Sequence, residues 1–358
     1  MKSLVIAEKP SVARDIARVL HCTQKGNGIL EGKEYVVTWA LGHLVTLADP
    51  EEYDKKYKEW KMEDLPMLPD TFRLEVIKQS AKQFQAVKAQ LNRQDVDQVV
   101  IATDAGREGE LVARLILKKT GCKKPLKRLW ISSVTDKAIR DGFAHLKDGK
   151  DYEPLYDAAM SRAEADWMVG INATRALTCK YNAQLSCGRV QTPTLAMIAR
   201  REEQIRQFVP KPYYGLSMRA EGVRFQWKDE KSHSAQSFDK ERIQKLFDGL
   251  KGKEAVISSV KKAPKRTEAP LLYDLTELQR EASRRYDYSA KETLNIMQRL
   301  YENHKVLTYP RTDSRYLTAD ILPTIKERLR ACSIGPYKLL AGRLINQPLP
   351  AKPSFVND

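Results

Sequence analysis

The chain has 358 residues, and its 62 Lys and Arg outnumber its 46 Asp and Glu, giving a formal net charge of +16. This length allows two or three domains, and the basic charge predicts a polyanionic partner, with nucleic acid as the first candidate. The five cysteines form no CxxC pair, which argues against a zinc site or a disulfide framework. No apolar run approaches the length of a signal peptide or a membrane span, so we expect a cytosolic protein that makes no membrane contact.

The first predicted β-strand, Ser3–Ala7, is followed directly by Glu8, Lys9 and a helix that begins at Ser11. Open α/β sheets place their sites at the carboxyl ends of strands, which is where Glu8 stands. Lys9 supplies a point charge that suits a phosphate. A further strand is predicted over Tyr35–Leu41.

Two residues after these strands have simple structural interpretations. His43 is a lone histidine, and such residues are more often packed or capping than catalytic. Trp60 ends a segment rich in Lys and Tyr that is typical of a loop meeting a nucleic acid strand, although a solvated loop is the simpler interpretation. The segment Gly26–Lys33 has the wrong spacing for a phosphate-binding loop, so no nucleotide-driven motor is indicated.

An acidic turn joins the predicted strand Val99–Ala102 to a helix with apolar periodicity. Asp104, Glu108 and Glu110 crowd this turn, and a parallel neighbouring strand would bring Glu8 beside it. Carboxylates that lie close together repel one another, so a divalent cation such as magnesium is expected to hold them. The alternative is a solvated turn whose acidic residues stabilise the N-terminus of the helix.

Further elements complete one α/β domain. A helix over Gln83–Leu91 precedes the acidic turn, and a strand over Arg128–Ile131 and a helix from Asp136 follow it. Strands and helices alternate to about Lys150, which predicts a mainly parallel sheet covered by helices.

A long, Ala-rich helix is predicted over Tyr156–Lys180. Arg162 and Asp166 lie one turn apart on it, and a surface ion pair is their simplest interpretation. The flexible stretch Gln184–Gln191 follows, where glycine beside arginine lets backbone N–H groups approach a phosphate.

The chain then changes character. Thr192 and Pro193 are expected to cap a helix that runs to about Gln207. After the proline-rich boundary at residues 210–212, three short alternating runs predict a β-containing domain. These runs are Tyr214–Met218, Val223–Trp227 and Ala255–Val260.

Two helices joined by a short turn are predicted after a basic linker. The first covers Thr276–Tyr286, and Ser289 with Glu292 forms a capping box that opens the second. The pair resembles a helix-turn-helix, a fold that need not bind DNA.

Tyr309 follows these helices in a stiff, extended segment. Pro310 fixes its own φ and biases Tyr309 toward an extended conformation, and Arg311 can project to the same face as the tyrosine. A tyrosine in such a segment is usually core or half-buried filler.

Four motifs, taken in chain order, resemble those of the type IA DNA topoisomerases. They are Glu8–Ser11 (EKPS), Thr103–Glu110 (TDAGREGE), Ser186–Pro193 (SCGRVQTP) and Leu307–Ser314 (LTYPRTDS). The helix segment Arg162–Trp167, with the residues that follow it to Arg175, is closer to topoisomerase III than to topoisomerase I.

The resemblance implies a multidomain protein of α/β, α and β parts. Residues 1–150 would form a Rossmann-like Toprim domain, and residues 151–212 a helical domain that contributes to single-strand DNA binding. Residues 213–268 would form a partial β-containing toroid domain, and residues 269–358 a truncated helix-turn-helix-like domain that carries the catalytic tyrosine. The chain stops at Asp358, before the family's His-rich segment, so we expect a partial toroid from a fragment or a truncated product.

The resemblance also implies ATP-independent cleavage and religation of single-stranded DNA. Tyr309 would be the nucleophile and form a 5'-phosphotyrosine, which stores the bond energy. Glu8 would exchange a proton with the 3'-oxygen, and Lys9 and Arg311 would stabilise the transferring phosphoryl group.

Glu8, Asp104 and Glu108 would bind Mg²⁺ in the implied site. Many family members have a second Asp where Gly106 stands here, so we expect a weaker site or one that water completes.

The implied partners are single-stranded DNA and negatively supercoiled or catenated duplex DNA. The resemblance also implies a monomer at the nucleoid in the bacterial cytoplasm. The residues implied along the path of the strand are Ser186, Cys187, Gly188, Arg189, Val190, Gln191, Arg175, Trp167, Arg162, Trp60 and His43. Two alternatives remain: a Toprim metal nuclease or primase that does not use Tyr309, and a truncated DNA-binding remnant without strand passage.

Overall fold

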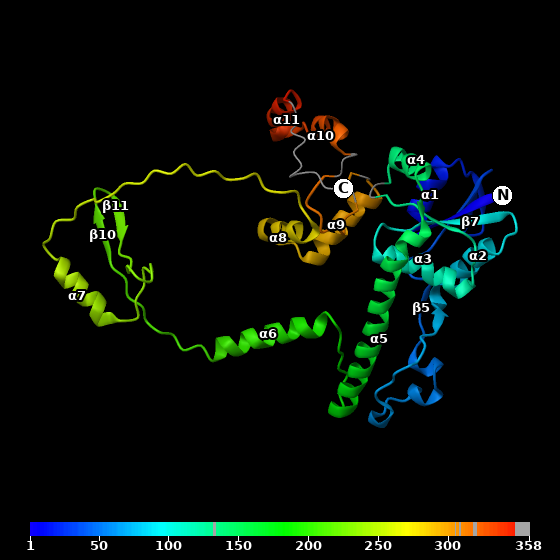
Figure 1. Ribbon diagram of the computed structural model, residues 1–358, viewed down its shortest axis with the longest axis horizontal. Coiled ribbons are helices and arrows are strands. Elements are labelled where there is room, and N and C mark those ends of the chain that lie inside the picture. Colours follow the sequence, from blue (N-terminus) through cyan, green and yellow to red (C-terminus); the bar gives the residue numbers. More distant parts are fainter. Residues whose placement is uncertain (132–133, 305, 308, 318–320, 348–358) are drawn as a thin grey trace. The chain divides into compact units, whose positions relative to one another are not determined.

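The computed structural model describes residues 1–131, 134–304, 306–307, 309–317 and 321–347 (Figure 1). The chain divides into two units, the first comprising Met1–Arg189 and Ala269–Asp358 and the second comprising Val190–Glu268. Thr308 of the tyrosine motif and the terminal Asp358 lie outside the described residues.

A seven-stranded sheet organises the first unit, with strand order β2-β3-β4-β1-β7-β8-β9. The four central strands, β4 to β8 in that order, are parallel, whereas β2, β3 and β9 pair antiparallel at the edges. The predicted mainly parallel sheet is therefore confirmed for its centre only. The strands are β1 (Lys2–Ala7), β2 (Gln24–Gly26), β3 (Ile29–Glu31), β4 (Tyr35–Trp39), β7 (Val96–Ala102), β8 (Leu126–Arg128) and β9 (Lys147–Asp148).

Helices cover both faces of this sheet. One face packs against α1 (Pro10–Val19) and α4 (Asp136–Ala144), and the other against α2 (Ala81–Leu91), α3 (Arg107–Thr120) and α5 (Glu153–Tyr181). Because side chains alternate along a strand, Leu4 and Ile6 of β1 join the second face while Val5 and Ala7 join the first. Strands buried on both sides read as continuous apolar runs, which explains why β1 and β7 could be predicted.

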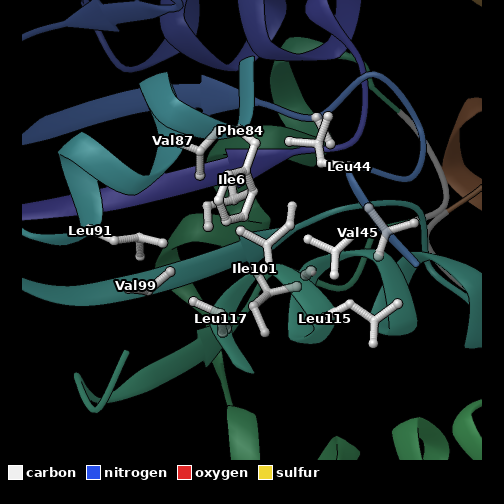
Figure 2. Packing of buried hydrophobic residues seen from close by; sticks show 14 of the residues in the cluster. Ile6, Leu44, Val45, Phe84, Val87, Leu91, Val99, Ile101, Leu115 and Leu117 are labelled. Atoms are coloured by element: carbon white, nitrogen blue, oxygen red, sulfur yellow. The ribbon is translucent and has the colours of Figure 1, made fainter. Parts of the chain in front are cut away.

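Figure 2 shows the core on the face that α2 and α3 cover. Side chains of these helices meet those of the two central strands there, and none is more than a few per cent exposed. The labelled residues of this cluster are Ile6, Leu44, Val45, Phe84, Val87, Leu91, Val99, Ile101, Leu115 and Leu117.

Smaller elements complete the first unit. A two-stranded antiparallel ribbon consists of β5 (Val45–Leu47) and β6 (Leu74–Val76). The C-terminal helices are α8 (Leu275–Tyr286), α9 (Ala290–Glu302), α10 (Ile325–Ala331) and α11 (Lys338–Ile345). The short 3₁₀ turns are η1 (Pro50–Glu52), η2 (Lys55–Lys58), η3 (Met62–Asp64), η4 (Lys78–Ser80), η5 (Gly149–Tyr152), η6 (Leu322–Thr324) and η7 (Gly335–Tyr337).

The second unit contains two helices and one hairpin: α6 (Gln191–Arg206), β10 (Ser217–Ala220), β11 (Val223–Gln226) and α7 (Lys240–Leu250). The strand predicted over Ala255–Val260 is wrong, because that segment is exposed and has no regular structure. Its β-branched residues have no partner strand among the described residues, and β-propensity without a partner does not make a strand.

Two predicted boundaries also differ from the structure. The strand predicted over Arg128–Ile131 ends at Arg128, and the helix expected to be capped by Thr192 and Pro193 already begins at Gln191. The cap of α9 is as predicted, because the Ser289 side chain accepts a hydrogen bond from the Glu292 backbone N–H at 3.1 Å.

Candidate functional site

Two neighbouring strands bring Glu8 and Asp104 together. In the parallel pair β1 and β7, Ala7 stands opposite Ala102, so both chains leave the sheet at the same edge. The Asp104 backbone N–H donates a hydrogen bond of 3.1 Å to Oε2 of Glu8. The expected juxtaposition of the two acidic residues at the carboxyl ends of parallel strands is therefore present.

The turn that carries Asp104 is held by short-range contacts. Thr103 Oγ1 donates to the Gly109 carbonyl at 2.7 Å, and the Gly106 N–H donates to the Asp104 carbonyl at 2.9 Å. A Cβ on Gly109 would stand 2.1 Å from the Asp104 carbonyl oxygen, so only glycine allows this close approach. The position of Asp104 is consequently fixed before any ligand arrives.

Arg128 anchors the same turn from inside the domain. Its guanidinium is fully buried and donates to the carbonyl oxygens of Thr103 and Asp104, each at 2.8 Å. Its Nε lies 2.9 Å from Oε2 of the equally buried Glu110, whose other oxygen accepts from Arg114 at 2.8 Å. This role was not predicted, because the contacts that define it join residues distant in the chain.

Burial changes the acidity of the paired carboxyl groups. It raises the pKa of Glu8 above the ordinary value, and the negative charge of Asp104 raises it further. Burial also raises the pKa of Asp104, although Lys9 and a hydrogen bond from Tyr309 oppose the shift. These directions agree with two carboxyl groups that share a poorly solvated site, where one group readily carries a proton.

Tyr309 lies against the acidic pair. Its hydroxyl forms a hydrogen bond with Asp104, and its ring packs edge-on against that of Tyr301, with centroids 5.8 Å apart. Burial and the charges of Asp104 and Glu8 raise the pKa of Tyr309 to about 12, while the charge of Arg311 opposes that shift. The structure therefore brings together Glu8, Asp104, Tyr309 and Arg311, four of the predicted site residues.

Lys9 has a partner that the sequence did not indicate. Its Nζ lies 2.8 Å from Oε1 of Glu302, the last residue of α9. Burial alone would lower the pKa of Lys9, but the hydrogen bond with Glu302 and the nearby acidic charges outweigh it and raise the pKa. Lys9 is thus a charged lysine already bound to a carboxylate.

Glu108 lies apart from the pair formed by Glu8 and Asp104. It forms an ion pair with Arg162, and its Oε2 is 4.0 Å from Nε2 of His43. Within the described part of the chain, no three His, Cys, Asp or Glu side chains gather closely enough to hold a metal ion. The adjacent carboxylates of Glu8 and Asp104 still fit a divalent cation, because hard cations take oxygen ligands and complete their shells with water.

Gly106, in the acidic turn, is open. Its backbone is extended, and among the described residues other than its two chain neighbours no atom lies within 4 Å of where a Cβ would stand. A side chain would therefore meet no obstacle at this position.

The predicted DNA-contact loop is attached to α5. The Cys187 backbone N–H donates to Thr174 Oγ1 at 2.9 Å, and Arg189 Nε donates to Asp166 at 2.7 Å. Hydrogen bonds from Arg189 lower the pKa of Asp166, so this pair is charged on both sides. Both arginines predicted to contact DNA near the acidic turn, Arg162 and Arg189, thus have acidic partners.

The predicted aromatic contacts divide into two kinds. Trp167 is buried, donates from Nε1 to the Ala48 carbonyl at 2.9 Å, and lines a cavity of 230 Å³. Trp60 is 49% exposed, and the buried Arg175 guanidinium lies 5.0 Å from its ring centroid. Trp60 is therefore the one of the two whose ring is open to a nucleobase.

Comparison with known proteins shows the class of protein to which this chain belongs. Residues 3–134 match the model of the Toprim domain, in agreement with the sheet and the acidic turn described above. Residues 150–350 match the family model described as DNA topoisomerase, and the chain belongs to this family. These matches, together with the relatives and the solved structure described next, confirm the predicted resemblance to type IA topoisomerases of the topoisomerase III kind.

Curated relatives match over the whole chain. DNA topoisomerase 3 of Shouchella clausii is 65% identical over 359 aligned residues, and that of Bacillus subtilis is 58% identical over 357 residues. Each match covers 100% of this chain and 49% of the relative, so the chain spans about half the length of these relatives. The solved full-length topoisomerase I of Thermotoga maritima aligns with a TM-score of 0.64 at 25% identity, covering 92% of this chain and 52% of that one.

None of the described helices is long and apolar enough to cross a membrane.

Proposed function

We propose that this chain carries the strand-cleavage and religation centre of an ATP-independent type IA DNA topoisomerase that acts on single-stranded DNA. The observation that supports it best is the hydrogen bond between Tyr309 and Asp104, because it sets a nucleophile against the buried acid pair. A phenol with a pKa of about 12 keeps its proton in the free protein, so a base has to accept that proton during cleavage.

Cleavage begins when the Tyr309 oxygen attacks a backbone phosphorus and the bond from phosphorus to the 3'-oxygen breaks. Asp104 already accepts a hydrogen bond from the phenol and can take its proton. Glu8, whose raised pKa favours the protonated form, donates a proton to the departing 3'-oxygen. Religation reverses these transfers, and the phosphotyrosine bond supplies the energy without ATP.

Cations near the nucleophile stabilise the transferring phosphoryl group. Lys9 and Arg311 carry these charges. Lys9 acts electrostatically on Glu8 and Asp104, and Arg311 acts on Tyr309. Glu8 and Asp104, with Glu108 if it leaves Arg162, would hold Mg²⁺, which supplies charge neutralisation at the 3' end of the cleaved strand.

The strand reaches the centre along α5 and the loop after it. Arg189 and Arg162 would bind phosphates, and Trp60 would stack on a base. The buried Arg175 would contribute by supporting the ring of Trp60. Ser186, Cys187, Gly188, Val190, Gln191, Trp167 and His43 remain the other expected contacts. We expect negatively supercoiled or catenated DNA at the nucleoid in the bacterial cytoplasm to be the substrate of the whole protein.

Trapping of the covalent complex tests this function. Oligonucleotides labelled at the 5' end or at the 3' end are incubated with the chain. Only the 3' label should become attached to protein, because the cleaved fragment is joined to Tyr309 through its new 5'-phosphate. Tyr309→Phe should abolish attachment while ssDNA binding persists, because the ring and its packing against Tyr301 are retained. Cleavage that survives in Tyr309→Phe would identify a Toprim nuclease instead. DNA binding without cleavage by both the unmodified chain and the variant would identify a DNA-binding remnant.

A further inference from the structure

The ion pair between Lys9 and Glu302 joins parts of the chain that are far apart in sequence. Lys9 follows the first strand of the sheet, and Glu302 ends the helix that leads to Tyr309. The two side chains are each 27% exposed, so solvent reaches the pair only in part. Gln298 also donates to Oε1 of Glu302 and fixes that carboxylate on α9.

The pair lies in an open cleft rather than in the core. Lys9 and Glu302 line a cleft of 470 Å³ together with Ser11 and Arg14 at the beginning of α1. Glu302 is the acidic residue among those that line it, and Lys9 and Arg14 are the basic ones. Such a cleft can admit an anion only after the negative charge of Glu302 has been overcome.

Electrostatics favour an ionised pair. Burial would raise the pKa of Glu302, but hydrogen bonds from Lys9 and Gln298 outweigh it and lower the pKa. Lys9 also faces the charges of Asp104 and Glu8. A phosphate arriving at Lys9 would meet the Glu302 carboxylate at contact distance, and two anions at one ammonium repel each other.

We infer that Glu302 is a positioning residue: it occupies Lys9 in the DNA-free protein and is exchanged for a DNA phosphate when the strand enters. This inference rests on the proposed function of Lys9 at the cleavage centre. The exchange releases α9 from its polar contact with the sheet domain at the moment that Lys9 binds substrate. Tyr301, next to Glu302 on α9, packs on Tyr309, so the ion pair lies one residue from the contact that supports the nucleophile.

Glu302→Gln tests the exchange, because glutamine keeps the size of the side chain and removes its charge. We expect binding of a fluorescent single-stranded oligonucleotide to tighten by about two- to fivefold at low salt, the range of a partly exposed ion pair. Fluorescence anisotropy in the Tyr309→Phe background measures binding without cleavage. A parallel thermal melt checks that each variant is folded, and Glu302→Asp provides a second variant that keeps the charge but shortens its reach.

A double-mutant cycle with Lys9→Ala separates the exchange from a general charge effect. The affinity gain from Glu302→Gln should disappear when Lys9 is absent. Glu281→Gln is the matched control, because Glu281 also forms an ion pair on a neighbouring helix, with Arg284 and Arg285. An equal gain in both Lys9 backgrounds, an equal gain from Glu281→Gln, or no gain at all contradicts the inference.

The result also remains distinct from failure of the proposed function. If the coupling between Glu302 and Lys9 appears in binding but no covalent complex forms through Tyr309, the ion pair controls an anion site and the cleavage assignment is wrong. If the covalent complex forms and the coupling is absent, the cleavage assignment holds and the exchange is wrong.

Discussion

The sheet domain and the second unit use charged residues in opposite ways. In the sheet domain, Arg128 and Glu110 are fully buried beneath the acidic turn and hold the site from inside. In the second unit, Asp229 is held by its own loop and by Arg242, whose side chain is 53% exposed, and helix α6 has no buried residue. The buried pair of Arg128 and Glu110 can hold the acidic turn in place because a hydrophobic core surrounds it.

The difference follows from apolar burial. Every residue from Ser3 to Ala7 in β1 is buried, whereas every residue of β10 and β11 is exposed. Since burial of apolar surface is the main favourable term in folding, the sheet domain can support strained or desolvated groups that the second unit cannot. Pairs of variants, one at a buried group and one at an exposed group, test this comparison.

The largest effect is expected when the buried ion pair is broken. Glu110→Gln leaves the Arg128 charge uncompensated in the core and should lower the free energy of unfolding by about 3–5 kcal/mol. Urea unfolding followed by circular dichroism measures the loss. Glu153→Gln is the control, because Glu153 also lies near Arg114, at 3.9 Å, but is 59% exposed and should change stability by less than about 0.5 kcal/mol.

Truncation of one apolar residue in each region should give the next largest difference. Ile116 of α3 is fully buried, so Ile116→Ala should destabilise the sheet domain by about 2–5 kcal/mol. Ile198 of α6 is 55% exposed, so Ile198→Ala should change stability by less than about 0.5 kcal/mol. The same urea experiment measures both, and a loss of 2 kcal/mol or more in Ile198→Ala would mean that α6 is packed in solution.

The same contrast explains how far the sequence predicts the fold. In the sheet domain, continuous apolar strands alternate with amphipathic helices, and the predicted strands Ser3–Ala7 and Val99–Ala102 are close to β1 and β7. In the second unit, the hairpin was foreseen approximately and helix α6 was predicted from the residues expected to cap it, but helix α7 (Lys240–Leu250) was not predicted. Exposed elements have no core to impose a periodic pattern, so the sequence records them weakly.

The residues of the candidate site likewise divide into those that the sequence predicts and those that it does not. Glu8 and Asp104 follow directly from the rule that strand ends carry sites, because each is the neighbour of a predicted strand. Tyr309 could be singled out only through the family resemblance. Arg128 and Glu302 escaped notice because their roles depend on contacts with residues distant in the chain, which no local pattern records.

The smallest expected effect concerns acid stability of the second unit. The Ser232 backbone N–H and then Arg242 lower the pKa of Asp229 below its ordinary value. A carboxyl group whose pKa is lower in the folded state stabilises that state above its unfolded pKa of about 3.9, and the benefit is lost as the pH falls below this value. Hydrogen exchange of the α7 amides, corrected for intrinsic rates, should therefore show protection that is nearly constant from pH 6 to about pH 4 and declines toward pH 3.

Asp229→Asn should make that protection lower at pH 6 and nearly independent of pH, because asparagine accepts hydrogen bonds without a titrating charge. Asp248→Asn is the control: Asp248 is exposed on α7 and only accepts from Gln244 at 3.2 Å, so its loss should leave the decline unchanged. If Asp229→Asn retains the full decline, the loop carboxylate does not govern acid stability. The second unit would then owe its stability to groups other than its most heavily hydrogen-bonded acid, and the contrast with the buried Arg128 pair would need another cause.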